Sequence, residues 1–337
     1  MFFRLKRVDQ GDKVNKTLTK TLRGFVAGTL ALVCASVIAA DFPKEVVKLV
    51  VPSGAGGTND LVARLLAPKL AEKLGSPFVV ENKPGAGGII GTDSVAKAKA
   101  DGHTLLVTSS VHTVAPSVFK SLPYDAIKDF TPITTLVSVP MVLVGSPQLP
   151  VSSMNELLSL AKSQPGKLQF GSAGNGTLNH LLGELLRSTA DINIVHVPYK
   201  SIGAAVQDVM GGHIPLAFAS LPSVAANIRA GQLKGLGLAK ARDGTAVQGI
   251  PPIADSVPGY DADLWVGIFA PSGTPDSIVA QLHAAVTEVL KSVEVSTKLA
   301  EMGAIPLTSS SENFSNALKE DLMRWSKVVT ATGAKVD

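Results

Sequence analysis

Two glycine-rich segments, VPSGAGGTND (51–60) and GSAGNGT (171–177), each lie between an apolar run and a helical pattern. Glycine lets a backbone approach a ligand closely, and the first N–H groups of a helix have no partner inside the helix. The helix dipole also favours negative charge at that end. Both segments therefore predict a site that holds an anion on backbone amides.

The composition of these segments favours a carboxylate over a phosphate. Neither contains lysine or arginine, and the string GxxxxGK[ST] of P-loops does not occur in the chain. A carboxylate has fewer oxygens and less charge than a phosphate ester, so it suits a lysine-free cradle. A third segment, PGAGGIIG (84–91), has the spacing GxGxxxG rather than GxGxxG. We interpret it as a turn for close helix packing rather than a dinucleotide site.

Residues for catalysis or metal binding are sparse. The six histidines, at positions 103, 112, 180, 196, 213 and 283, show neither HxxxH nor HxH spacing, which disfavours a metal site. No cofactor is implied. His180 falls in the first turn of the helix after GSAGNGT. Two interpretations stay open for it: a hydrogen bond to whatever the loop holds, or a plain surface position. His180 with Ser172 is the one base–nucleophile pair that the sequence suggests.

The N-terminal segment is typical of a secretory signal peptide. The chain has 31 Lys/Arg and 27 Asp/Glu; residues 1–39 hold seven and two of these, which leaves 24 and 25 in the remainder. A basic stretch is followed by an apolar run, with small residues before a cleavage site near Ala39/Ala40. We therefore expect a periplasmic protein. The near-neutral remainder lacks the charge that nucleic-acid binding requires, and the single cysteine, Cys34, lies in the leader.

Apolar β-branched runs alternate with helical patterns along the rest of the chain, which predicts an α/β fold with mostly parallel sheets. A long extended stretch near 130–146 and a second at 264–271 are interpreted as crossovers between two lobes. The expected organisation is a signal peptide at 1–39, a discontinuous first lobe at 40–138 plus 264–337, and a second lobe at 139–263. A ligand cleft is expected between the lobes.

From about Phe42 to its end, the chain resembles the Bug receptors, the periplasmic substrate-binding subunits of tripartite tricarboxylate transporters. The matching segments follow in order and include KLVVPSGAGGTNDLVARLLAPKLAEKLG, FVVENKPGAGGIIGTDSVAKAKADGHTLLV, LPYDAIKDFTPIT, LQFGSAGNGTLNHLLGELL, VHVPYK and LWVGIFAPSGTP. The resemblance implies a two-lobed, type II "Venus flytrap" periplasmic binding fold. It also implies a small carboxylate ligand held by the two lobe loops.

Matching the family motifs residue by residue gives the expected ligand site: Ser53, Gly54, Ala55, Gly57 and Thr58 in the first loop, Ser172, Ala173, Gly174 and Thr177 in the second with His180 nearby, Ser109 and Ser110 after the third strand, and Tyr199 and Ala219 toward the distal end of the ligand. Many relatives read Phe-Asp-Asn where this chain reads Phe218-Ala219-Ser220. Without that aspartate, we expect a ligand other than an amino acid. Asn59 also replaces the usual Thr or Ser.

The resemblance implies a non-enzymatic, monomeric receptor that delivers a small organic acid to the membrane subunits of a transporter. Two alternatives remain at this stage. One is a secreted enzyme that acts on a small carboxylate, and the other is a ligand sensor for a two-component system. Turnover of the ligand would distinguish an enzyme from a receptor, whereas uptake and signalling depend on partner proteins.

Overall fold

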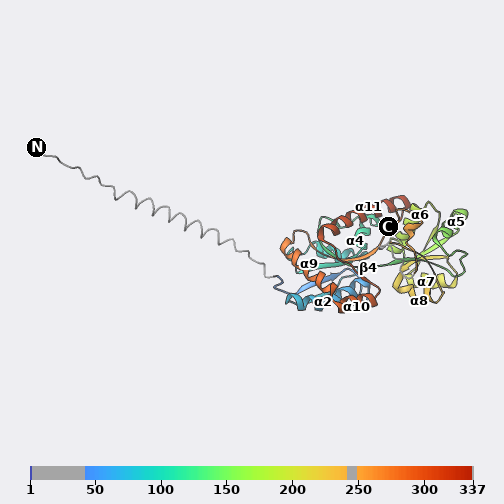
Figure 1. The fold of residues 1–337 in the computed structure, drawn as a ribbon. Helices are drawn as coiled ribbons and strands as arrows, with labels where there is room; N and C mark the ends of the chain where they lie inside the picture. The colour runs from blue at the N-terminus through green and yellow to red at the C-terminus, as the bar shows by residue number, and fades with distance from the viewer. Residues whose placement is uncertain (2–41, 241–248, 336–337) are drawn as a thin grey trace. The chain divides into compact units, whose positions relative to one another are not determined.

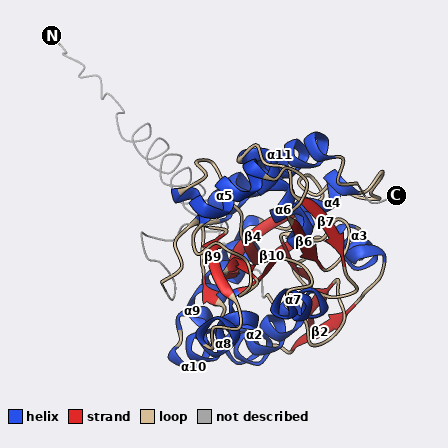
Figure 2. Cartoon of the chain, turned by 90° about the vertical axis from the view of Figure 1, so that its right-hand side faces the viewer, coloured by secondary structure: helices blue, strands red, loops and turns tan. Residues whose placement is uncertain are grey.

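Two mixed β-sheets, each flanked by helices, form the fold of the computed structural model, which describes Met1 and residues 42–240 and 249–335 (Figures 1 and 2). The fold is a two-lobed α/β fold. The predicted signal peptide, its cleavage site and Cys34 lie outside the described residues. Within the described ranges, no helix has the length and apolar character needed to cross a membrane.

The first sheet has the strand order β11-β4-β10-β3-β1-β2. Its strands are β1 (Val47–Val51), β2 (Phe78–Asn82), β3 (Thr104–Ser109), β4 (Phe130–Val139), β10 (Leu264–Pro271) and β11 (Ile305–Pro306). The chain segments between and after these strands form helices α2 (Thr58–Leu74), α3 (Ile89–Ala96), α4 (Val111–Val118), α9 (Asp276–Lys291), α10 (Val293–Glu301) and α11 (Ser311–Thr332), and the short 3-10 turn η1 (Ala86–Gly88).

The second sheet has the order β7-β6-β8-β5-β9. Its strands are β5 (Met141–Gly145), β6 (Gln169–Ser172), β7 (Val195–Pro198), β8 (Leu216–Ser220) and β9 (Lys234–Leu238). The accompanying helices are α5 (Met154–Ser163), α6 (Leu178–Thr189), α7 (Ile202–Gly211) and α8 (Leu221–Arg229), with the 3-10 turn η2 (Ile253–Asp255).

The expectation of mostly parallel sheets was wrong. In the first sheet β1 runs parallel to β2 and β3, but β10 is antiparallel to β3 and β4, and β11 is antiparallel to β4. In the second sheet β6 is parallel to its two neighbours, whereas β5 is antiparallel to β8 and β9. The antiparallel strands include the predicted crossovers. A buried strand is uniformly apolar in either orientation, so composition alone did not distinguish them.

The predicted extended stretch near 130–146 divides at Pro140. β4 belongs to the first sheet and β5, directly after that proline, to the second. The chain returns to the first sheet in β10. Both predicted stretches thus include strands of the first sheet, and the first continues into the second sheet.

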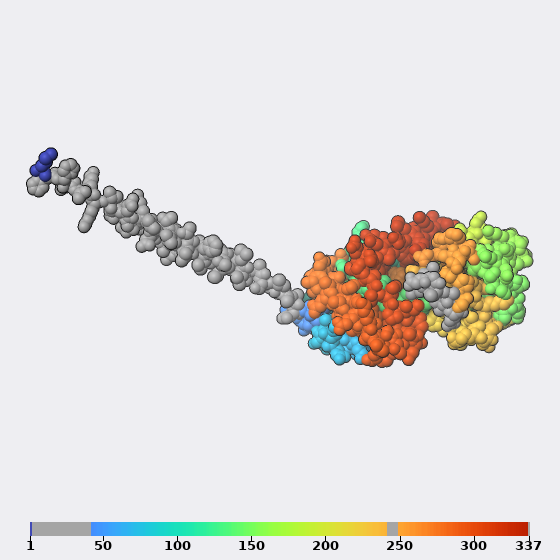
Figure 3. All heavy atoms as spheres, in the orientation of Figure 1, coloured from blue at the N-terminus to red at the C-terminus, as the bar shows by residue number. Residues whose placement is uncertain are grey.

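The C-terminal helix α11 packs on the hydrophobic cores of both sheets. Phe314 and Leu318 belong to a buried cluster with residues of β1, β3 and β10, whereas Trp325 and Val329 lie in a cluster with residues of the second sheet. Figure 1 shows α11 running past α4 toward α6, and it contacts both helices. In the space-filling view, orange and red C-terminal residues lie beside light-blue residues of α2 (Figure 3).

Candidate functional site

The first glycine loop joins the end of β1 to the N-terminus of α2, as predicted. Residues 54–57 of this loop are exposed, and Ser53 and Thr58 are partly buried. Gly57 is the N-cap residue; its backbone is extended (φ −75°, ψ 165°) and no side chain caps the helix there. The first amides of α2 therefore lie at an uncapped helix end, which is suited to an anion.

A buried carboxylate holds this loop in place. Asp60, 2% exposed, accepts hydrogen bonds from Gly56 N (2.8 Å), Arg64 Nε (3.0 Å) and Asn82 Nδ2 (2.9 Å). Asn82 also donates to Ser53 O at 3.2 Å, and Arg64 donates to Asn82 Oδ1 at 2.9 Å. Asp60 at Gly56 and Asn82 at Ser53 thus connect the loop to the neighbouring strand β2.

The same contacts keep Asp60 ionised. Burial alone would raise the pKa of its carboxyl group, but the hydrogen bonds from Arg64, Gly56 and Asn82 and the charge of Arg64 outweigh it and lower the pKa. The contacts by which Asp60, Arg64 and Asn82 hold the loop were not predicted. The i,i+4 spacing of Asp60 and Arg64 was a visible signal, whereas the contact with Asn82 depends on the pairing of β1 with β2.

The second glycine loop joins β6 to α6 and is stabilised from within. Thr177 is the N-cap residue, and its Oγ1 accepts from His180 N and donates to Gly174 O. Ser172 Oγ accepts from Gly174 N at 3.0 Å and also contacts Gly174 O at 3.1 Å. Gly174 has φ +117°, a conformation that residues with side chains rarely adopt. Ala173 lies partly exposed in this loop.

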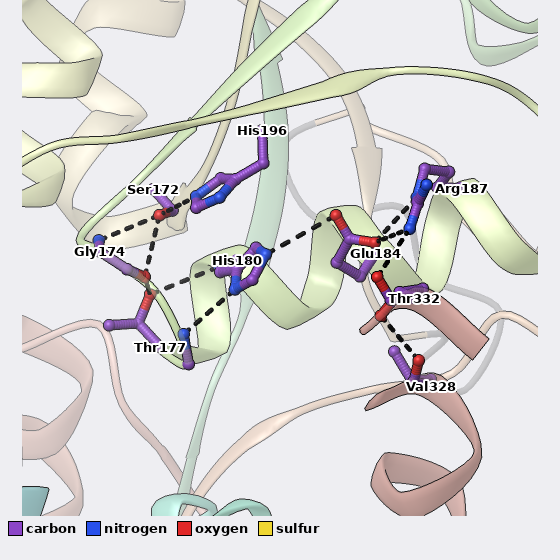
Figure 4. Close-up of polar contacts among 10 residues, drawn as sticks. Ser172, Gly174, Thr177, His180, Glu184, Arg187, His196, Val328 and Thr332 are labelled. Atoms are coloured by element: carbon purple, nitrogen blue, oxygen red, sulfur yellow. Dashed lines mark hydrogen bonds and ion pairs between the residues drawn. The ribbon is translucent and has the colours of Figure 1, made fainter. Parts of the chain in front are cut away.

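Two stacked histidines lie behind the second loop (Figure 4). His180 and His196 have ring centroids 3.8 Å apart. Gly176 N donates to Nδ1 of His180 at 3.1 Å, so Nε2 carries the hydrogen and faces Glu184 Oε1 at 3.6 Å. His196 Nε2 lies 2.6 Å from Ser172 Oγ. Each ring therefore contacts a different part of the loop.

The surroundings of the stacked rings shift the pKa values of His196 and Glu184. Burial lowers the pKa of His196 to about 4. Burial opposes ionisation of Glu184, but hydrogen bonds from His180 and Arg187 and the charge of Arg187 lower its pKa overall. Arg187 binds Glu184 Oε2 at 2.8 Å and also reaches Thr332 O in α11 at 3.4 Å (Figure 4). The second loop is thus linked through α6 to the C-terminal helix.

The arrangement corrects two expectations. His180 is 6% exposed, so it does not occupy a plain surface position; it hydrogen-bonds to the loop itself. Ser172 contacts His196 rather than His180, and its side chain is fully buried. A buried serine does not reach a substrate, so the pair of Ser172 and His180 is not a nucleophile and base. His196 was missed because it lies 24 positions after Ser172, and the sequence does not show that β6 pairs with β7.

Ser109 lines a cavity, and its neighbour Ser110 does not. The cavity has a volume of about 280 Å³ and lies where β1 and β3 end, between α3 and α4; it also includes Ser53 and Asn59. Ser110 is fully buried at the start of α4, and its Oγ has no hydrogen-bond partner among the described residues. The two predicted serines therefore have different environments.

Tyr199 and Ala219 are placed by packing within the second lobe. The Tyr199 hydroxyl donates to Asp208 Oδ2 at 2.7 Å, and burial together with that carboxylate raises the tyrosine pKa to about 12. Ala219 on β8 is fully buried in an apolar cluster with Val142 and Val144. Its methyl group is therefore in the core, while Ser220, next along the strand, stays partly exposed.

Among residues 42–240 and 249–335, no group of three or more His, Cys, Asp or Glu side chains is placed to hold a metal ion. The chemistry that the two loops offer is therefore that of backbone amides and hydroxyl groups at two helix N-termini. Such groups bind carboxylates by hydrogen bonds without a cationic side chain.

Comparison with known proteins identifies the family to which this chain is similar. The family model for the "Tripartite tricarboxylate transporter family receptor" matches residues 62–334. Protein BugT of Bordetella pertussis is 36% identical over 328 residues, which cover 96% of this chain and 100% of that protein.

Two solved structures are similar in fold and sequence. An R. palustris protein solved with adipate is 34% identical, with a TM-score of 0.72, and the match covers 88% of this chain and 100% of that one. MatC of Rhodopseudomonas palustris, solved with bound malate, is 33% identical, with a TM-score of 0.69 and coverage of 86% and 100%.

Proposed function

The chain belongs to the tripartite tricarboxylate transporter receptor family, and on that premise we propose that it captures a small organic carboxylate between its two lobes and delivers it to membrane transporter subunits. Receptors of this family are periplasmic solute-binding proteins. We also propose that the leader is removed near Ala39/Ala40 and that the receptor acts as a monomer.

The observation that carries this proposal is the pair of glycine loops. Each loop follows a strand and leads into a helix N-terminus, one beside each sheet, and neither contains a cationic side chain. Each is held from behind by buried polar groups, Asp60 in one case and His180 with His196 in the other. Preformed amide donors bind an anion without the cost of ordering a loop.

The lobe boundaries are part of the proposal. We propose residues 40–138 plus 264–337 as one lobe and 139–263 as the other, supported by the sheet to which each strand belongs. Ligand binding would favour the closed arrangement of the lobes by as much as the ligand binds that form more tightly. Within this site we propose Ser53, Thr58, Ser109 and Thr177 as hydroxyl contacts beside the loop amides, with Ser172 holding the second loop from behind.

A ligand panel tests the proposal directly. Mono-, di- and tricarboxylates, with amides of the same acids as controls, are added to the purified mature protein in thermal-shift and calorimetric titrations. A bound acid at a hundredfold excess over its Kd raises stability by about 2.7 kcal/mol. Mass spectrometry of ligand released on denaturation identifies an acid carried through purification. If no acid binds or co-purifies, the proposal is wrong.

We propose binding without turnover. Titration with an acid that binds, followed by quantitative recovery, is expected to return the acid unchanged and in stoichiometric amount. A catalytic decrease in that acid would instead favour an enzyme. Delivery to transporter subunits is tested by uptake in cells that lack the receptor, with and without the restored gene.

A further inference from the structure

The cavity beside the first loop is lined by a buried histidine, one of whose ring nitrogens has no hydrogen-bond partner among the described residues. His112, at the start of α4, lines this cavity and is 2% exposed. Its Nε2 lies 2.8 Å from Ala126 O. A carbonyl oxygen only accepts hydrogen bonds, so Nε2 carries the ring hydrogen and Nδ1 has a free lone pair. No described residue donates to Nδ1.

The surroundings hold His112 in this neutral state. Burial lowers its pKa to about 4, more than the hydrogen bond to Ala126 raises it. Phe130 and Phe269 pack against the ring, each with a centroid distance of 4.9 Å. At neutral pH, Nδ1 is therefore a fixed acceptor. A buried acceptor without a partner is unfavourable, so a donor that reaches it is bound preferentially.

The rest of the lining is uncharged. The polar side chains are Ser53, Asn59, Thr92, Thr108, Ser109 and His112, and the remainder are apolar or glycine, with Tyr124 at one side. An ionised group entering this cavity would lose water without finding a counter-charge, which is costly. An uncharged group with a hydrogen-bond donor has the matching chemistry.

The position of the cavity connects it to the proposed carboxylate site. Ser53 and Asn59 line the cavity and belong to the first loop and the first turn of α2, and Ser109 ends β3. A ligand whose carboxylate binds the loop amides would therefore extend its other end toward the cavity. The volume of about 280 Å³ is large enough for the distal part of a small organic acid.

We propose that this cavity is the specificity pocket for the uncharged distal part of the acid, and that Nδ1 of His112 accepts a hydrogen bond from a hydroxyl group there. This inference rests on the proposed function. It identifies the ligand class as hydroxylated carboxylic acids, and it gives His112 the role of discriminating them from the corresponding acids without the hydroxyl.

Matched acid pairs test the preference. Calorimetry compares two pairs of acids with an uncharged distal part, 3-hydroxybutyrate with butyrate and 4-hydroxybenzoate with benzoate, on the mature wild-type protein. We expect at least one hydroxy acid to bind about tenfold or more tightly than its partner. If acids bind but no pair differs, the inference is wrong while the proposed function stands. If no acid binds, both are wrong.

Variants then assign the preference to Nδ1. His112→Phe removes the acceptor, and His112→Gln keeps an amide donor for Ala126 while displacing the acceptor, so the test does not depend on one variant folding. In a folded variant the tenfold ratio is expected to fall to about one, with the affinity for the deoxy acid largely kept.

The matched control is His283→Phe, which removes another histidine whose Nε2 contacts a carbonyl, Ser309 O at 2.9 Å, outside the cavity. It is expected to retain the ratio. A ratio that persists in the folded His112 variants, or that falls equally in the control, overturns the proposal. As a direct measurement, the ¹⁵N resonance of His112 Nδ1 is expected to move upfield with the hydroxy acid and not with its partner.

Discussion

His180 and His196 stack with their ring centroids 3.8 Å apart, and each contacts a different part of the second glycine loop. The 15 residues between them in sequence include the end of α6 and the start of β7. The stack therefore fixes the loop relative to both elements. Because the pKa of His196 is lowered to about 4 in the folded protein, the stability of this region should respond to pH.

The stability of the protein is expected to fall as the pH decreases from about 6.5 to about 4. The unfolded chain binds a proton on histidine near pH 6.5, whereas folded His196 and His112 do so only near pH 4. The unfolded state therefore holds more protons in this window, and acid favours it. Below pH 4 these two groups cause no further loss.

The measurement is the melting temperature as a function of pH for wild type and His196→Gln, which does not titrate. The variant is expected to show a shallower decline between pH 6.5 and 4. His213→Gln, a change at an exposed histidine, is the control and should keep the wild-type slope. An equally steep decline in the His196 variant would count against this account.

Gly57→Val is expected to weaken carboxylate binding by at least tenfold without unfolding the protein. Gly57 has φ −75°, which valine tolerates, and a Cβ there meets no atom closer than 3.7 Å. The added side chain would instead lie over the first amides of α2. Calorimetry with an acid that binds wild type measures the loss.

Gly174→Val should also abolish binding, but with an added cost in stability because Gly174 has φ +117°. Gly203→Val, at an exposed glycine of α7 outside both loops, is the control for affinity. Wild-type affinity in Gly57→Val would remove the first loop from the site.

Asp60→Asn is expected to destabilise the protein by about 1–3 kcal/mol, because it replaces one of two buried acceptor oxygens by an NH2 donor and removes the charge that pairs with Arg64. Affinity for the acid should fall as well, since the first loop loses its brace. Urea unfolding and calorimetry measure the two effects.

The control for that variant is Asp93→Asn. Asp93 forms an i,i+4 pair with Lys97, their side chains being 24% and 65% exposed, and solvent-exposed pairs of this spacing contribute only about 0.3–0.5 kcal/mol. Equal losses in the two variants would show that the buried network around Asp60 has no special role.

Trp325→Ala is expected to cost about 3–5 kcal/mol. This side chain is fully buried in the cluster that joins α11 to the second lobe. Met323→Ala, on the same helix with the side chain 58% exposed, should change stability by less than about 0.5 kcal/mol. Chemical denaturation distinguishes them, and similar values would contradict the packing of α11 described above.

Local patterns determined much of the fold and the position of both loops. The apolar run of β1, the glycines after it and the amphipathic pattern of α2 depend on neighbouring residues, so the strand–loop–helix unit was visible in the sequence. The absence of lysine and arginine from both loops was equally plain and favoured a carboxylate. Helix α4 was missed, since its valines, threonine and proline are poor helix formers; burial of Val114, Ala115 and Val118 stabilises it.

Contacts between residues that are distant in sequence could be seen only in the folded structure. The strand directions, the bond of Asn82 to Asp60 and the pairing of Ser172 with His196 each depend on which strands become neighbours. The free lone pair of His112 depends on a carbonyl 14 residues away and on the burial of the ring. The sequence thus specified which groups could bind an anion. Packing decided which of these groups hold the loops in place and which line a cavity, because burial and strand pairing are properties of the assembled fold.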